Sequence, residues 1–174
     1  MNRLTKFAAG AVCSVAVIIG IVQQRHPDLR TSPQGLAIIG NAEGCRRDPY
    51  QCPADVLTVG IGSTAASGEK IEPNRRYTDE EIADRWATDI RTAEACVNRY
   101  ANGRKLPQGA FDAMVSMTFN VGCGAMRKST MFRLARENQI AQACNELPKW
   151  IYAGGRKLRG LEIRREKEKK RCEE

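Results

Sequence analysis

The side chains that this sequence offers for chemistry are mainly carboxylates, thiols and hydroxyls. It contains one histidine, His26, which lies beside an N-terminal apolar stretch. Peptidases of the Ser-His-Asp and Cys-His types need a histidine in the folded body, and zinc amidases usually need two or more. These enzyme classes are therefore disfavoured, and a carboxylate, a thiol or a hydroxyl must supply the reactive groups.

One group of each kind occurs in a short segment near the start of the chain. Glu43 is followed after eight residues by Cys52, and after five more by Thr58. A glutamate at the end of a helix is usually solvated, and a Gly-Ile-Gly run such as residues 60–62 is usually a turn. The spacing alone is therefore weak evidence for a catalytic site.

The elements around these three residues can be predicted from capping and turn signals. Ser32-Pro33 predicts the start of a helix, because serine caps helix N-termini and proline suits the first helical position. Gly44 ends that helix just after Glu43. Residues 45–77 contain short β-branched pieces separated by glycine and proline, which predict a small hairpin sheet. Glu43 is thus placed at a helix end, immediately before the hairpin.

The remaining chain reads mainly as helices. Thr78-Asp79-Glu80-Glu81 is a capping box, and the apolar periodicity that follows predicts a long helix to about Tyr100. Pro107 opens a second, apolar helix. Shorter helices are expected at 129–137 and 139–147, and a last helix at 161–171. With 174 residues, 42% of them hydrophobic and 28% charged, the sequence predicts one α+β domain over residues 29–174.

The N-terminus carries a weakly apolar segment. Residues 7–22 contain no charge, and Arg3 and Lys6 precede them, so the positive-inside rule places the N-terminus in the cytoplasm and the domain outside it. The run is shorter than the roughly 20 residues of a spanning helix. Two interpretations remain, a cleaved signal peptide and an uncleaved marginal anchor. We expect residues 1–28 to be a membrane segment, and the domain is exported in either case.

Seven cysteines agree with export to an oxidising compartment. Their spacing matches no zinc ligand set and suggests disulfides with one thiol left over. They are Cys13, Cys45, Cys52, Cys96, Cys123, Cys144 and Cys172. Cys13 lies within the apolar segment, so it cannot reach the others while that segment is in the bilayer.

Several motifs together resemble the phage-type lysozymes, glycoside hydrolase family 24. The active-site hairpin of this family has the pattern Glu, eight residues, Asp or Cys, five residues, Thr, which Glu43, Cys52 and Thr58 match. The resemblance extends from about Thr31 to Cys172. Its other motifs are Thr58-x-Gly-Ile-Gly, Phe119-Asn-Val-Gly122, Trp150-x-Tyr-x-Gly-Gly155 and Gly160-Leu-x-x-Arg-Arg165.

The resemblance implies a two-lobed, lysozyme-like α+β fold and hydrolysis of bacterial peptidoglycan. Glu43 would be the acid that protonates the departing oxygen, and Thr58 would position the attacking water. Cys52 stands where many relatives carry Asp, so its thiol would have to ionise to replace a carboxylate. An arginine of the C-terminal region helps to hold the glutamate in relatives, and Arg159 and Arg164 are the candidates. No cofactor or metal is implied.

The cysteines also resemble those of signal-arrest-release endolysins, which a weak anchor holds inactive until it escapes the membrane. Cys13, Cys45 and Cys52 match the members that carry one cysteine in the anchor and two in the hairpin. A Cys45–Cys52 disulfide would block the site, and attack of Cys13 on Cys45 would release Cys52. The alternative is a passive disulfide framework.

The four remaining cysteines, Cys96, Cys123, Cys144 and Cys172, are expected to form two structural disulfides. The sequence permits three pairings and does not choose among them. We favour 96–123 and 144–172.

The C-terminal segment is strongly basic, and the whole chain has a net charge of +8. Nucleic-acid binding is one interpretation of such a run. Interleaved glutamates at helical spacing indicate a salt-bridged helix instead. Attraction to an anionic cell wall is sufficient to explain the charge. Trp86, Trp150 and Tyr152 are assigned to the core rather than to sugar platforms.

The sequence therefore predicts a monomeric endolysin that acts on peptidoglycan for host lysis and binds no nucleic acid. It would be tethered in the host inner membrane first and soluble in the periplasm after release. A lytic transglycosylase is the first alternative, since the Asp is missing, although Thr58 argues against it. A basic, membrane-tethered binding protein without activity is the second.

Overall fold

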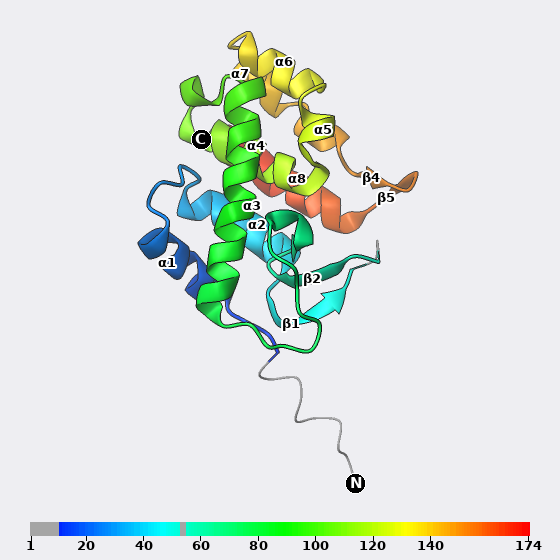
Figure 1. The fold of residues 1–174 in the computed structure, drawn as a ribbon. Helices are drawn as coiled ribbons and strands as arrows, with labels where there is room; N and C mark the ends of the chain where they lie inside the picture. The colour runs from blue at the N-terminus through cyan, green and yellow to red at the C-terminus, as the bar shows by residue number, and fades with distance from the viewer. Residues whose placement is uncertain (1–10, 53–54) are drawn as a thin grey trace. The chain divides into compact units, whose positions relative to one another are not determined.

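The computed structural model describes residues 11–52 and 55–174, and its elements confirm the α+β class. Contacts divide the chain into two compact units. The sheet unit consists of residues 1–29 and 43–89, and the helical unit of residues 30–42 and 90–174. Figure 1 shows the elements of both in chain order. Residues 1–10 of the predicted membrane segment lie outside the described part.

The sheet unit contains the predicted hairpin sheet. Strands β1 (Arg46–Gln51), β2 (Leu57–Gly60) and β3 (Ser63–Thr64) pair antiparallel in that order. Figure 1 labels the first two. Gly60 has a φ of +65°, and a Cβ there would lie 2.8 Å from Cγ2 of Ile82. Glycine is thus required both by the backbone conformation and by the close approach of the first turn of α3.

Part of the apolar N-terminal segment is folded into the same unit. Helix α1 (Val15–Arg25) is capped by Ser14, and it buries Ile18 and Val22 completely or nearly so. Val17 on the same helix is 51% exposed. In residues 11–52 and 55–174, no helix has the length and hydropathy that crossing a membrane would require.

Helix α3 (Asp79–Tyr100) begins with the predicted capping box. The Thr78 amide donates to Oε2 of Glu81 at 2.8 Å, and the Glu81 amide donates to Oγ1 of Thr78 at 3.2 Å. Trp86 on this helix is completely buried, as expected. The long amphipathic helix is therefore confirmed at both its start and its end.

The helical unit contains the other predicted helices, within a few residues of their expected bounds. They are α2 (Pro33–Glu43), α4 (Gln108–Val121), α6 (Thr130–Arg136), α7 (Ile140–Cys144) and α8 (Arg159–Cys172). The short helix α5 (Cys123–Met126) was not predicted. Helix α4 packs against α8 (Figure 1). A Cβ at Gly109 of α4 would lie 2.1 Å from the Arg171 carbonyl oxygen, so the contact requires glycine at this position.

A short hairpin of the helical unit was not predicted. Strands β4 (Tyr152–Ala153) and β5 (Arg156–Lys157) are joined by Gly154 and Gly155, which both have positive φ. This is the Gly-Gly signal of a two-residue hairpin turn. Tyr152 is 62% exposed, so its assignment to the core was wrong. All four residues of the two strands are exposed, so the whole hairpin lies at the surface.

The described cysteines include three disulfides. Cys96–Cys123 joins α3 to α5, and Cys144–Cys172 joins α7 to α8. These are the two pairings favoured from the sequence. The third, Cys13–Cys45, joins the segment before α1 to the residue before β1.

Candidate active site

Glu43 is the last residue of α2 and leads directly into the hairpin. Gly44 follows with a φ of +76°, which ends the helix, and the Glu43 side chain is half-buried. The N-terminus of α2 is held firmly. The Ser32 amide and hydroxyl donate to the carboxylate of Asp112 at 3.0 and 2.5 Å, and Ser32 Oγ accepts from the Gly35 amide. The helix that carries Glu43 is thus anchored through a completely buried carboxylate.

Cys52 and Thr58 are linked through one hydrogen-bond acceptor in the turn of the hairpin. The Val56 carbonyl accepts from the Cys52 amide and from Oγ1 of Thr58, each at 3.0 Å. Thr58 is 3% exposed and pairs with Tyr50 of β1. Cys52 is half-buried and remains a thiol. The hairpin therefore brings two of the three predicted residues together and fixes the direction of the Thr58 hydroxyl proton.

Tyr50 is a residue of this site that the sequence analysis missed. Burial raises the pKa of its phenol, and the negative charges of Glu43 and Cys52 raise it further, while Arg46 opposes them. The Arg46 guanidinium lies over the Tyr50 ring at 4.6 Å. Tyr50 thus lies within electrostatic range of both Glu43 and Cys52. Its proximity to Glu43 becomes evident only in the folded structure, because seven positions separate the two residues along the chain.

Cys45 is bonded to Cys13 and not to Cys52. The Cα atoms of Cys13 and Cys45 are 5.1 Å apart, and the Cys13 amide donates to the Cys45 carbonyl at 3.2 Å. The Arg47 amide donates to the Ala11 carbonyl at 2.7 Å, and Val12 forms an isolated bridge with Arg46. Residues 11–13 therefore lie as an extended piece beside the start of β1.

The two arginine candidates of α8 lie in different surroundings. Arg159 is 74% exposed and pairs with Glu162 at 3.5 Å. Arg164 is 5% exposed, and its Nε donates to Glu168 at 3.1 Å. Arg164 also lines a pocket of about 210 Å³. The other lining residues are Ile38, Asn41, Ala42, Gly160, Ile163 and Lys167. Arg164 thus shares a pocket with Asn41 and Ala42 of α2, and Arg159 is not among the residues that line it.

The C-terminal motifs of the sequence meet at Arg165. Its guanidinium contacts the side chains of Asn120 and Glu168, and its Nε donates to the Trp150 carbonyl at 3.1 Å. Arg165 is 1% exposed, and burial lowers the pKa of its guanidinium. These motifs therefore build one buried ion cluster of Arg164, Arg165 and Glu168. The ion pairs along α8 confirm the expected salt-bridged helix.

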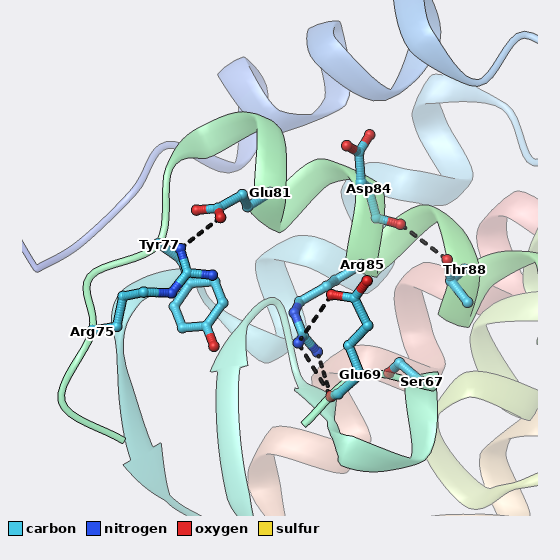
Figure 2. Close-up of a pocket in the computed structure, with 8 residues that line it drawn as sticks. All are labelled: Ser67, Glu69, Arg75, Tyr77, Glu81, Asp84, Arg85 and Thr88. Atoms are coloured by element: carbon cyan, nitrogen blue, oxygen red, sulfur yellow. Dashed lines mark hydrogen bonds and ion pairs between the residues drawn. The ribbon is translucent and has the colours of Figure 1, made fainter. Parts of the chain in front are cut away.

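A polar pocket of about 320 Å³ in the sheet unit contains none of the predicted site residues (Figure 2). Arg75 lies over the Tyr77 ring and pairs with Glu81, and Arg85 pairs with Glu69. Four of the charged groups of this pocket thus pair with one another, whereas Asp84 pairs with Arg25 of α1. The described residues also contain no cluster of His, Cys, Asp or Glu that could hold a metal ion.

Comparison with known proteins assigns the family. The phage lysozyme family model matches residues 40–168, which include Glu43, Cys52 and Thr58. The chain belongs to the phage lysozyme family. It is 42% identical to the SAR-endolysin of Escherichia phage P1, over 99% of this chain and 96% of that protein. It is 38% identical to the SAR-endolysin of Haemophilus phage HP1, over 96% and 97% of the two chains.

Solved structures of the P1 endolysin provide a comparison of states for this lysozyme fold. The crystal structure of its active form matches with a TM-score of 0.87 at 42% identity, covering 94% of this chain and 95% of that one. The secreted inactive form matches with a TM-score of 0.57 at 40% identity, covering 82% and 94%. The structure described here is thus more similar to the active form than to the inactive one.

Proposed function

We propose that this chain is a phage endolysin, a muramidase that hydrolyses the β-1,4 bond between N-acetylmuramic acid and N-acetylglucosamine in peptidoglycan. The proposal is supported by the family, by the names of full-length relatives and by the residues at the hairpin. The observation that carries it is that the Thr58 hydroxyl and the Cys52 backbone amide both donate to the Val56 carbonyl, in the hairpin that directly follows Glu43.

The proposed mechanism assigns one role to each of the three residues. Glu43 donates its proton to the departing glycosidic oxygen, as general acid. Thr58 donates its own proton to the Val56 carbonyl, so its oxygen presents lone pairs that can accept from the attacking water. Cys52, as a thiolate, stabilises the positive charge that develops on the sugar. No cofactor or metal takes part, and the enzyme acts as a monomer.

Mass spectrometry of fragments from purified peptidoglycan tests this reaction. The full chain should release fragments with a reducing-end muramic acid, and Glu43→Gln should lower the rate by about 100- to 10,000-fold, the usual contribution of a general acid. Glu137→Gln is the matched control, because Glu137 is an exposed helix-end residue paired with Arg133. Products lighter by one water would indicate a transglycosylase. If the folded wild-type chain releases no fragments, the proposal that it is an enzyme is refuted.

The same cysteines support a proposal for regulation. While residues 1–28 are in the inner membrane, a Cys45–Cys52 disulfide withholds the Cys52 thiol. After release into the periplasm, the Cys13 thiolate attacks Sγ of Cys45, the Cys13–Cys45 bond forms, and Cys52 leaves as a thiolate. The step exchanges one disulfide for another, so it needs no external oxidant or reductant. The Cys13–Cys45 disulfide and the Cys52 thiol match its product.

A further inference from the structure

Helix α1 has few buried side chains with which to hold itself on the sheet unit. Ile18 and Val22 are its buried side chains, whereas Val17 is half-exposed. Its N-terminal end is fixed by the Cys13–Cys45 disulfide and by the extended residues 11–13. An 11-residue helix spans about 16 Å, so its other end needs an attachment of its own.

That attachment is a cluster of charged and polar groups at the C-terminal end of α1. Arg25 donates from Nε and Nη2 to the two carboxylate oxygens of Asp84, at 2.9 and 2.7 Å. His26 Nε2 donates to Oδ1 of the same carboxylate at 2.8 Å. One carboxylate of α3 therefore accepts three hydrogen bonds from two consecutive residues. A bidentate arginine contact gives this cluster a fixed geometry that single-bonded surface pairs lack.

The Asp84 side chain is directed toward α1 rather than into the polar pocket beside it. Figure 2 shows its carboxylate pointing away from Arg85 and Glu69, while its backbone carbonyl accepts from Thr88. The hydrogen bond from Arg25 lowers the pKa of Asp84, and the bond from His26 adds to this effect. Glu80, one turn earlier on α3, also attracts Arg25. The negative groups on this part of α3 thus face the first charged residues that follow the apolar run.

We propose that Arg25, His26 and Asp84 form a latch that captures the released N-terminal segment on the sheet unit and thereby favours the Cys13–Cys45 disulfide over Cys45–Cys52. The inference rests on the exchange step proposed above and adds a second attachment point to it. Seating the far end of α1 raises the effective concentration of Cys13 at Cys45, because the remaining search is confined to a short tether. Any contact made only in the seated state shifts the disulfide equilibrium by its own free energy.

The effect of the latch can be measured as the equilibrium ratio of the two disulfide isomers. Full-length variants are equilibrated at neutral pH in a glutathione buffer, quenched in acid, alkylated and mapped by mass spectrometry. Asp84→Asn and Arg25→Gln should each lower the ratio of Cys13–Cys45 to Cys45–Cys52 by about two- to fivefold, the range of a good exposed ion pair. The double variant should lose less than the product of the two single effects, because both remove one interaction.

The control is a pair of matching exposure that does not touch the N-terminal segment. Arg133 and Glu137 have side chains 51% and 43% exposed, against 49% and 40% for Arg25 and Asp84, and Arg133 also contacts both carboxylate oxygens. Glu137→Gln should leave the isomer ratio unchanged. An Asp84→Asn ratio equal to that of Glu137→Gln would overturn the proposal.

Amide hydrogen exchange of α1 tests the latch without using the disulfides. In the Cys13–Cys45 isomer, Asp84→Asn should accelerate exchange of the last turn of α1, and Glu137→Gln should not. If amide exchange is unchanged in Asp84→Asn, the latch is refuted. If amide exchange is faster but the isomer ratio is unchanged, the latch exists but does not influence the disulfides, and the proposal is refuted. Neither readout depends on muramidase activity, so failure of the latch and failure of the enzyme remain distinguishable.

Discussion

The disulfide of the sheet unit and those of the helical unit close loops of similar length in very different surroundings. The sequence separation is 32 residues for Cys13–Cys45, and 27 and 28 for the other two. Chain entropy alone would make each stabilise the fold by about 3.5 kcal/mol. What differs is the reinforcement beside them. The helical unit has a buried ion cluster and an α4 that is buried over residues 109–118, whereas α1 has two buried side chains and an exposed latch.

Because of this difference, the contacts of the helical unit are hard to open, whereas those of α1 can form and break easily. Glu168 is completely inaccessible, and its arginine partners are 5% and 1% exposed, so opening this cluster would strand charges in a poorly solvated interior. Arg25 and Asp84 are about half-exposed, and water can replace either partner at little cost. In the proposed exchange the segment docks after it leaves the membrane, and contacts of the second kind suit such a reversible attachment.

The largest effect is expected for Cys13→Ser. Without the Cys13 thiol, Cys45 and Cys52 can pair with each other, so host lysis should fail although the chain is made and folded. A mild thiol reductant should restore muramidase activity of the purified variant. The double variant Cys96→Ser/Cys123→Ser is the control, since it should lower the melting temperature and leave activity independent of reductant. Lysis on schedule by Cys13→Ser would exclude exchange from Cys13 as the switch.

Glu168→Gln should produce the largest loss of stability. The substitution keeps the shape of the side chain but leaves the Arg164 and Arg165 charges without their carboxylate, at an expected cost of about 3–5 kcal/mol in the free energy of unfolding. Urea unfolding measures it, with Glu137→Gln expected to change stability by less than about 0.5 kcal/mol. A Glu168→Gln loss as small as that of the control would mean that the two guanidinium groups reach water, and the contrast between the units would fail.

Local signals in the sequence were sufficient for most elements of the fold. The capping box at Thr78, the Ser32-Pro33 helix start and the glycines of the hairpin each act within a few residues, so a single sequence contains them. The contacts between distant parts of the chain are of another kind. Ser32 bonds to Asp112, 80 positions away, and the residues that meet at Arg165 come from three separate motifs. No periodicity encodes such pairs.

The same distinction explains what was missed at the site. Glu43, Cys52 and Thr58 were proposed from their spacing in a family pattern. Tyr50 was missed because it belongs to no spacing pattern, and its proximity to Glu43 depends on how the chain turns between α2 and β1. The side of α3 that receives α1 was equally hidden, since Asp84 reads as one more charge on a solvated face.

The smallest effect concerns Asp89, which holds β3 and the turn after it against α3. Its carboxylate accepts from the hydroxyls of Ser63 and Ser67, each at 2.5 Å. Burial raises the pKa of Asp89, and the two serines and Arg85 offset this only in part. The folded protein therefore binds the proton of Asp89 more tightly than the unfolded chain does. Its contribution to stability should decline as pH rises from about 4, the unfolded value, through the folded pKa.

Asp89→Asn removes this titration, so the wild-type chain should lose stability relative to the variant over that pH interval and hold a constant difference above it. Urea unfolding of both proteins at a series of pH values between about 4 and 7 gives the difference directly. A difference that stays constant, or that grows in favour of the wild type as pH rises, would show that the serine hydroxyls outweigh burial. In the expected case, the Asp89 carboxylate of the sheet unit is charged at neutral pH although burial disfavours the charge. In the helical unit, by contrast, two arginines balance the charge of the buried Glu168.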